Sequence, residues 1–473
     1  MLHVINRPAT KWYGVALALI AVLALPLVGG CDTKKILEVN DPDILTPASI
    51  SGPEALPTVR RAAVGEFALA YGGSGADGSG GIEGVIMYSG LLGDEWINSE
   101  TFPTRIEIDR RNIQITNGDV GTWFRQLQRT RVRAEFAGAG YAQFSPDPTT
   151  DPGYSEVLSL AGFTYLFFAE NWCSGIPFSH TDAGGNIVYG EPLTSAQMYD
   201  TALARFNSAL TIATAAGDNS LKFLAQVGQG RALIDQGNFA QAATAVAGVP
   251  TGFVYEVTYS LNSTRQNNGV YNANVANERY SVANVEGGVG LPYRSAADPR
   301  VSFTRTPATD VGFDRQTPQF DQLRYTFRDK PIPLATGLEA RLIEAEAALN
   351  TGGAGAGATS VPLLNALRAA PPAYITGNDL PIAPMGALAD PGAAATRVNQ
   401  FFQERGFWLW VTGHRLSDMR RLIRQYGRAT NTVFPTGPYF KNNLQYDGTD
   451  VNFPVPFDEQ NNPNFAQCLD RNP

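Results

Sequence analysis

Few side chains in this sequence could support catalysis. Only three histidines are present, at positions 3, 180 and 414, and Asp94-Glu95 is the acidic pair that could be considered for glycoside hydrolysis. Two carboxylates that cleave a glycosidic bond need a defined separation, whereas adjacent side chains diverge in a helix or strand. No HExxH, CxxC or GxSxG motif occurs, which argues against a zinc site or a serine nucleophile elbow. We therefore expect no enzyme activity, no metal site and no cofactor.

Trp96 and Asn98 instead combine the two contacts that a carbohydrate ligand requires. An aromatic ring covers the apolar face of a sugar, and an amide bonds its hydroxyl groups. Both residues lie in the polar segment GDEWINSET, which is predicted to be a loop. For Trp96, and for each aromatic candidate named next, the alternative is a loop side chain that packs on the scaffold. Further candidates on polar or glycine-rich segments are Tyr71, Tyr271, Tyr280, Tyr293 and Arg294.

The N-terminus predicts where such side chains would act. Residues 14–31, GVALALIAVLALPLVGGC, form an uncharged apolar run that ends in small residues before Cys31. Arg7 and Lys11 precede it, so the segment has the features of a secretory signal, and it is shorter than the ~20 apolar residues of a spanning helix. Val28 to Cys31 resembles a bacterial lipobox. We expect lipidation at Cys31, with an uncleaved membrane anchor as the alternative.

Two further cysteines, Cys173 and Cys468, remain in the exported chain. Thiols in an oxidising compartment are more often paired than free, so a disulfide is favoured over two buried thiols that never meet. The formal net charge of −8 gives no basic surface for nucleic acid. Charged residues make up only 17% of the chain, while 48 glycines and 31 prolines indicate many loops.

Helical periodicity is clearest in the centre of the chain. Tyr199, Leu203, Phe206 and Leu210 share one face of a predicted helix over 197–216. Residues 223–248 predict two helices joined at 236–238, with small residues that permit close approach, as in a tetratricopeptide hairpin. The fold class is therefore mainly α. Further helices are predicted over 56–71, 82–92, 121–143, 154–168, 338–349 and 396–425.

Two regions lack this periodicity. Residues 251–329 are rich in Asn, Gly, Tyr and Arg and contain candidate strands at 254–262 and 324–329, and residues 351–395 are rich in Gly, Ala and Pro. A glycine-rich run at 72–81 predicts a flexible loop. Long irregular segments on a rigid scaffold often carry binding residues, so the ligand is expected to face the first of these regions.

Several charged and aromatic residues are predicted to be structural. Arg415, Asp418 and Arg421 are spaced at i, i+3 and i+6, which would place one carboxylate between two guanidinium groups on a helix face. Glu344 and Glu346 are predicted to lie on a solvated helix edge, with one salt bridge to the scaffold. The apolar surroundings of three tryptophans predict core positions for Trp172, Trp408 and Trp410.

Segments in a fixed order across nearly the whole exported chain resemble the SusD/RagB-like family of outer-membrane lipoproteins. The lipobox is followed by ILEVN at 36–40, and LLGDE at 91–95 is similar to the family's short acidic motif. The other matching segments are FTYLFFAENWCSGIP at 163–177, DPR at 298–300, RLIEAEA at 341–347, ER at 404–405 with GHRLSDMRR at 413–421, and PVP at 454–456 with NP at 462–463.

The resemblance implies a non-catalytic lipoprotein that captures a nutrient, with a glycan favoured, for a TonB-dependent (SusC-like) barrel in the outer membrane. It also implies ligand contacts from Trp96 and Asn98, while Tyr71, Tyr293 and Arg294 are additional candidates from their positions beside the glycine loop or on polar segments. A lipid-anchored tetratricopeptide adaptor for envelope proteins is the alternative. The implied organisation is a signal peptide over 1–30, a lipidated tether over 31–58, a helical region over 59–250, a variable ligand-facing region over 251–337 and a C-terminal helical region over 338–473.

Overall fold

The computed structural model describes residues 52–75, 83–182, 185–305, 307, 309–350, 357–465 and 467–473. Residues 50–473 form one compact unit. The predicted signal peptide, the predicted lipidation site Cys31 and the predicted tether up to residue 51 lie outside the described residues, as do residues 76–81 of the glycine-rich loop. Within the described part of the chain, no helix has the length and apolar character needed to cross a membrane.

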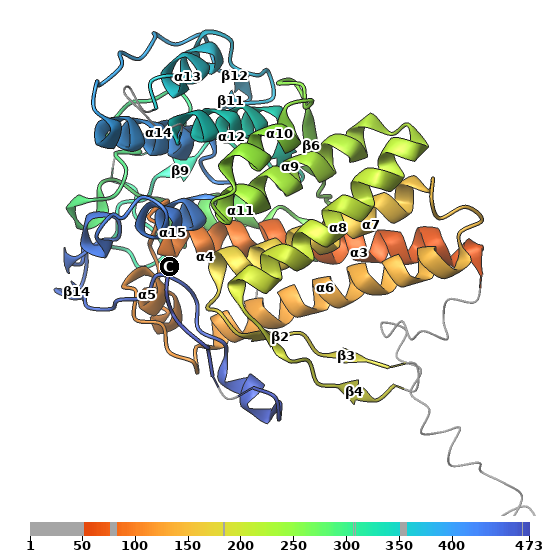
Figure 1. The fold of residues 1–473 in the computed structure, drawn as a ribbon. Coiled ribbons are helices and arrows are strands. Elements are labelled where there is room, and N and C mark those ends of the chain that lie inside the picture. The colour runs from red at the N-terminus through yellow and green to blue at the C-terminus, as the bar shows by residue number, and fades with distance from the viewer. Residues whose placement is uncertain are drawn as a thin grey trace, which may run out of the picture. The chain divides into compact units, whose positions relative to one another are not determined.

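The described chain is mainly helical, as predicted (Figure 1). The longer helices begin and end close to the predicted positions, and the segment predicted at 396–425 divides into two helices. The helices are α3 (Leu56–Gly72), α4 (Gly84–Leu92), α5 (Pro103–Asp109), α6 (Gly118–Phe144), α7 (Pro152–Asn171), α8 (Ser195–Ala216), α9 (Asn219–Asp235), α10 (Phe239–Val246), α11 (Gly269–Tyr271), α12 (Gly337–Leu349), α13 (Ser360–Ala369), α14 (Ala394–Trp408) and α15 (Arg415–Arg424).

Local capping fixes the ends of these helices. The Asn117 side chain accepts hydrogen bonds from two backbone N–H groups at the start of α6, and Thr194 forms a capping box with Gln197 at the start of α8. At the other end of α8, Gly217 takes the left-handed conformation that glycine adopts without steric cost. The tight turn between α9 and α10 likewise uses Gly237 at a φ of 79°, within the joint predicted at 236–238.

Consecutive helices stack in antiparallel pairs, which confirms the tetratricopeptide-like scaffold. Helix α8 packs between α7 and α9, and α10 connects α9 to α12 (Figure 1). The buried ring of Phe206 on α8 lies against Gly162 of α7 and Gly228 of α9, where an added Cβ would come within 2.7 and 2.4 Å of the ring. Small residues therefore let three helices approach around one aromatic side chain.

The strands are short and form only two-stranded ladders among the described residues. The pair nearest the candidate site joins β1 to β7 in antiparallel register, with Trp96 opposite Val282. The described strands are β1 (Trp96–Asn98), β2 (Ile176–Pro177), β3 (His180–Thr181), β4 (Ile187–Val188), β5 (Pro192–Leu193), β6 (Val254–Val257), β7 (Tyr280–Val282), β8 (Phe303–Thr304), β9 (Asp321–Gln322), β10 (Ile332–Thr336), β11 (Thr376–Gly377), β12 (Leu380–Pro381), β13 (Gly437–Pro438) and β14 (Gln445–Tyr446).

Two predictions for the irregular regions are wrong. Residues 324–329 form turns rather than a strand, because the backbone N–H groups of Arg324 and Tyr325 donate to the Gln322 side chain. Helix α13 lies inside the segment 351–395, which was predicted to lack regular structure. The strand predicted at 254–262 exists as β6 and pairs with β10.

The C-terminal segment returns to the first half of the chain. Cys173, at the end of α7, and Cys468 are joined in the predicted disulfide, with Cα atoms 5.9 Å apart. Next to it, Trp172 and Phe453 pack against Trp123 of α6. Trp172, Trp408 and Trp410 are all fully buried, as predicted from their apolar surroundings.

Candidate functional site

The principal residues predicted to contact a ligand are buried in this structure. Tyr71, Trp96, Asn98 and Tyr293 have no exposed surface, so none of them offers a face to a sugar. Tyr71 stacks on Phe167 at 5.6 Å, and its hydroxyl lies within hydrogen-bond distance of two backbone carbonyls. Its assignment as a surface ligand contact is therefore wrong: it is a core residue that ties α3 to the strand β10 and the segment after α14.

The segment predicted to be a surface loop at 93–101 contains the buried strand β1. Pairing with β7 covers its backbone, and the Trp96 indole packs against Trp410, which also contacts Tyr293. The backbone N–H of Asn98 donates to Asp109 at 2.8 Å. The side-chain oxygen of Asn98 accepts from the ammonium group of Lys441 at 2.7 Å. Trp96 and Asn98 therefore belong to the protein interior, beneath the exposed residues described below.

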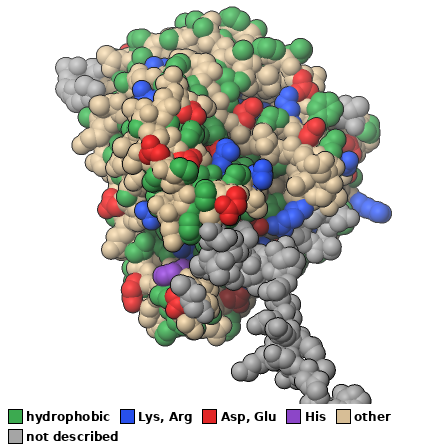
Figure 2. All heavy atoms as spheres, turned by 90° about the vertical axis from the view of Figure 1, so that its right-hand side faces the viewer, with side chains coloured by type: hydrophobic (Ala, Val, Ile, Leu, Met, Phe, Trp, Pro, Cys, Tyr) green, Lys and Arg blue, Asp and Glu red, His purple; other side chains and the backbone are tan. Residues whose placement is uncertain are grey.

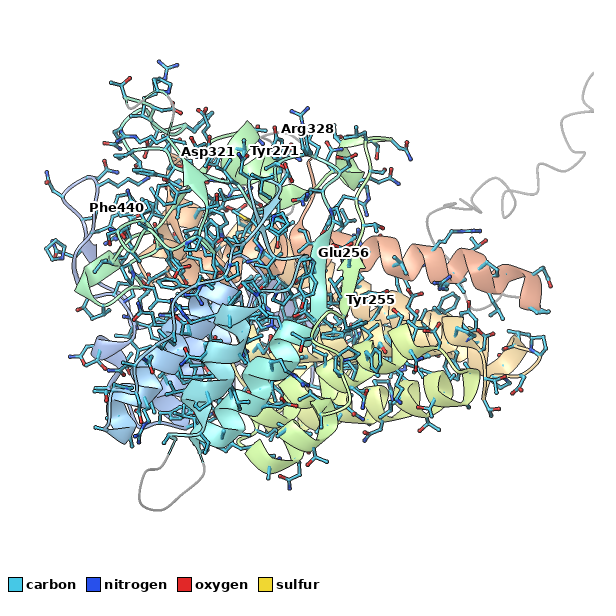
Figure 3. The ribbon with its side chains drawn as sticks, turned by 90° about the horizontal axis from the view of Figure 1, so that it is seen from above. Tyr255, Glu256, Tyr271, Asp321, Arg328 and Phe440 are labelled. Atoms are coloured by element: carbon cyan, nitrogen blue, oxygen red, sulfur yellow. A yellow bond between two sulfur atoms is a disulfide. The ribbon has the colours of Figure 1, made fainter. Side chains whose placement is uncertain are left out.

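The two remaining tyrosine candidates also differ from the prediction. Tyr280 lies on β7 and is fully buried, so it cannot contact a ligand. Tyr271 ends the short helix α11 and is half-buried, with the guanidinium of Arg328 6.0 Å from the centre of its ring. Figure 3 shows Tyr271 and Arg328 close together in this view, away from Phe440. The tyrosines of the variable region therefore do not form one binding surface.

A group of exposed aromatic side chains includes Phe102, which follows β1 by four residues. Phe102 is 41% exposed and Phe313 is 48% exposed, and the guanidinium of Arg279 lies over both rings, 5.3 and 4.5 Å from their centroids. Phe102 immediately precedes α5, and the backbone N–H of Phe313 donates to the carbonyl of Glu278, which adjoins Arg279. Three segments distant in sequence therefore meet in one phenylalanine–arginine–phenylalanine stack.

A buried carboxylate holds this stack in place. Glu100 is 1% exposed and accepts a hydrogen bond from Arg279 at 2.7 Å and another from Arg105 at 2.7 Å. Burial raises the pKa of Glu100, and both guanidinium groups oppose that rise. Because Arg279 is fixed by an ion pair, its guanidinium is presented to the two rings in one orientation.

Lys441 joins a fourth segment to the same surface. Its ammonium group donates to the carbonyls of Asn98 and Glu100 and to the carboxylate of Asp314 at 2.8 to 2.9 Å. The preceding residue, Phe440, is 37% exposed and lies at the periphery of the molecule in Figure 3. We define the phenylalanine surface as the exposed rings of Phe102, Phe313 and Phe440 together with the guanidinium of Arg279.

Amide side chains border the phenylalanine surface. Gln316 and Asn442 are exposed, and the Gln316 amide donates to the Asn442 oxygen at 3.2 Å. Exposed rings beside exposed amides supply the two kinds of contact that a carbohydrate needs. The face shown in Figure 2, which lies away from Phe440, instead has hydrophobic, acidic and basic side chains interspersed.

The acidic pair Asp94-Glu95 is enclosed beneath β1. Both side chains are buried, and a Glu95 oxygen accepts the backbone N–H of Val411 at 2.9 Å. Burial raises the pKa of Glu95 to about 8 and raises the pKa of Asp94 well above its usual range. Neither carboxylate reaches the surface, so the pair is placed for a structural role.

The predicted arginine clamp around Asp418 is half right. Arg421 does pair with Asp418, at 2.6 Å, but the second partner is Arg405 of α14, at 2.8 Å, and not Arg415. The turn between α14 and α15 brings Arg405 over the carboxylate, whereas the positive charge of Arg415 acts on Asp94 and Glu95 and opposes the rise of their pKa values.

The prediction for Glu346 is wrong. Its side chain is fully buried and forms an ion pair with Arg421, so it belongs to the same network as Asp418 rather than to a solvated edge. Glu344 is half-buried and pairs with Arg341 one turn earlier, as expected for a residue at a helix edge. Helix α12 thus presents Glu346, like Glu339, to the core and Glu344 to its rim.

Sequence reasoning missed the three exposed phenylalanines that make up the phenylalanine surface. Phe102 follows Asn98 by only four residues, so a site placed after β1 rather than on it would have included this ring. Phe313 and Phe440 have no distinguishing sequence signal. Each is a single aromatic residue in an irregular segment, and only the tertiary contacts of Arg279 and Lys441 connect them with Phe102.

The fold and this surface together define a helical-repeat scaffold that presents loop-borne aromatic side chains. No family model and no curated protein matches the sequence. Solved structures do match. A SusD superfamily protein from Parabacteroides distasonis shares 12% identity at a TM-score of 0.63, with 88% of this chain and 98% of that chain covered.

Two further matches cover similar lengths. A laminarin-binding SusD-like protein shares 14% identity at a TM-score of 0.57, with 88% of this chain and 99% of that chain covered. Surface glycan-binding protein A from Bacteroides thetaiotaomicron, in complex with laminarihexaose, shares 12% identity at a TM-score of 0.60, with coverage of 88% and 100%. This chain therefore has the SusD-like fold, and the resemblance inferred from its sequence is confirmed at the level of the fold.

Proposed function

We propose that this protein is a non-catalytic carbohydrate-capturing lipoprotein of the outer membrane that binds its ligand at the phenylalanine surface. The observation that carries the proposal is the stack of Phe102, Arg279 and Phe313. An exposed ring that is already held by a fixed guanidinium loses little conformational freedom when it covers a sugar. The neighbouring amides of Gln316 and Asn442 would bond the hydroxyl groups.

Two observations support a role in binding rather than catalysis. The acidic pair considered for hydrolysis, Asp94-Glu95, is buried beneath β1 and cannot contact a ligand bound above it. The structurally similar proteins include one that binds laminarin and one solved with laminarihexaose. Capture of a polysaccharide needs an exposed aromatic surface and no reacting group.

The cellular part of the proposal rests on the sequence and the fold. The apolar segment ending at Cys31 supports export and lipid attachment. We propose that the lipid anchors the protein in the outer membrane, facing the medium, and that the captured glycan passes to a TonB-dependent barrel. The adaptor alternative predicts soluble envelope proteins as partners instead. Mild detergent extraction of the tagged, full-length protein, followed by mass spectrometry, separates these two expectations.

Calorimetric titration with neutral polysaccharides, including laminarin, starch and xylan, tests the surface itself. We expect the Phe102→Ala/Phe313→Ala variant to lose at least tenfold in affinity for whichever polysaccharide the protein binds. Phe457→Ala is the matched control, because Phe457 is 51% exposed but lies outside the phenylalanine surface. If the double variant and the control bind as tightly as the unchanged protein, the assignment of the surface is wrong.

A further inference from the structure

A pair of arginines lies beside the phenylalanine surface. The guanidinium groups of Arg294 and Arg305 lie over the same ring, that of Phe320, at 4.1 and 5.1 Å from its centroid. Both arginines are half-buried. Burial lowers the pKa of Arg294, and the positive charge of Arg305 contributes to that decrease. The two guanidinium groups therefore interact electrostatically.

Neither guanidinium forms an ion pair with a carboxylate of the described residues. Their Nε atoms are buried without a hydrogen-bond partner, and within the described chain the side-chain hydrogen bond of the pair runs from Arg305 to the carbonyl of Asp310, at 3.3 Å. The nearby Arg279 and Arg105 are different, because Arg279 pairs with Glu100 and Arg105 pairs with both Glu100 and Glu83. Two adjacent, half-buried positive charges without a contacting carboxylate among the described residues repel each other, and an anion between them would offset that repulsion.

The acidic side chain that acts on Arg294 is already occupied. Glu286 raises the pKa of Arg294 through its charge, but its oxygens accept from the Asn284 backbone and the Tyr446 hydroxyl. Burial raises the pKa of Glu286 as well. Asn284 also fixes the backbone at Arg294 and Ser295. The loop is therefore held in place while the guanidinium of Arg294 is left for another partner.

The arginine pair is continuous with the phenylalanine surface. The segment from Asp310 to Pro318 folds back on itself through a bridge between Val311 and Pro318, and Phe313 lies on this segment. Arg305 donates to the carbonyl of Asp310 at the base of the segment, and Phe320 follows its end. At ~3.3 Å per extended residue, the three steps from Asp310 to Phe313 span at most about 10 Å. A single short oligosaccharide can reach both places.

We infer that Arg294 and Arg305 form an anion subsite and that the captured carbohydrate is an anionic glycan, with a carboxylate or sulfate group between the two guanidiniums. Planar guanidinium groups recognise such oxyanions through parallel N–H···O bonds. This inference rests on the proposed function, since the neutral part of the same glycan would lie on the phenylalanine surface.

The test uses calorimetric titration of the full chain with two matched pairs of probes. Polygalacturonate is compared with its carboxyl-reduced form, and carrageenan with its desulfated form, so the source of the oxyanion is distinguished. We expect tighter binding of the anionic form in at least one pair. The Arg294→Gln/Arg305→Gln variant should lose at least tenfold in affinity for that form and less than twofold for the neutral form. Arg129→Gln, an exposed arginine on α6, is the control.

The outcomes separate this inference from the proposed function. Equal affinity for the charged and neutral forms in both pairs, or unchanged binding by the double arginine variant, overturns the anion subsite. Binding of laminarin, starch or xylan alone overturns it too, while the phenylalanine surface stands. If the protein binds none of the charged and none of the neutral polysaccharides, both the anion subsite and the phenylalanine surface are overturned. Selective loss of anionic binding in the arginine variant, with the control unchanged, supports the inference.

Discussion

Replacing Asp418 by Asn should destabilise the protein by about 3–5 kcal/mol, the usual cost of leaving a buried charge without its partner. Asp418 is 1% exposed and accepts from Arg405 Nε at 2.8 and 3.0 Å and from Arg421 Nη2 at 2.6 Å. Loss of the negative charge would leave the buried guanidinium of Arg405 without an ion-pair partner among the described residues, whereas Arg421 would keep its ion pairs with Glu346 and Asp235. The substitution keeps the shape of the side chain, so the loss measures charge rather than packing.

The pH dependence gives an independent value for the same interaction. Burial alone would raise the pKa of Asp418, but the guanidinium groups of Arg405 and Arg421 lower it to about 2, from a usual 3.8. A decrease of this size corresponds to about 2–3 kcal/mol of folding free energy at neutral pH. Because the folded-state pKa is the lower one, this stability is present above pH 4 and is lost as the pH falls towards 2.

Urea unfolding followed by tryptophan fluorescence measures both effects. The structure also predicts which arginine is coupled to Asp418. In double-variant cycles, Asp418→Asn should show a coupling energy above about 1 kcal/mol with Arg405→Gln and below about 0.5 kcal/mol with Arg415→Gln. Equal coupling to both arginines, or an Asp418→Asn cost below about 1 kcal/mol at pH 7, would refute the reasoning.

Three further perturbations probe the core. Burial raises the pKa of Glu95 to about 8, so the contribution of this side chain to folding stability falls as the pH rises from 4.5 to 8. The Glu95→Gln variant should therefore match the unchanged protein in melting temperature near pH 5 and exceed it at pH 8.5. A Gly228→Ala methyl would meet the phenylalanine ring on α8 at 2.4 Å and should cost about 1–3 kcal/mol, whereas Gly65→Ala meets nothing and should be neutral or stabilising, which paired urea titrations would show. Reduction of Cys173–Cys468, which spans 295 residues, should cost about 2–5 kcal/mol; an equal melting temperature with and without reductant would contradict this.

The helical scaffold could be predicted because its signals are local. Tyr199 and Phe206 share one helix face because of their spacing alone, and the turn at Gly237 is set by a single residue that accepts a positive φ. The small residues that admit Phe206 also occur within the helices themselves. The shared helix face and the turn each depend on residues within about one or two turns of one another, so the chain order was sufficient to place them.

The sequence indicated the region of the candidate site but not the side chains that form it. Whether Trp96 faces solvent or core is decided by β7, which pairs with β1 from a distant part of the chain, at residues 280–282. The polar composition of GDEWINSET does not distinguish a surface loop from a buried strand. The exposed ring of Phe102 becomes part of a surface only when Arg279 and Phe313 arrive from other segments. No spacing rule connects those three positions.

The two partners of Asp418 show the same limit within a single motif. Arg421 was predicted correctly because a helix places residues three apart on one face, and α15 is a regular helix. Arg415 satisfies the same rule at the start of that helix, yet the ion pair forms with Arg405 of the preceding helix. A local rule gives the residues that can meet, and the packing of α14 against the rest of the core selects among them. A buried carboxylate takes the guanidinium groups that are brought to it by the fold, so the assignment of Arg405 required the tertiary structure.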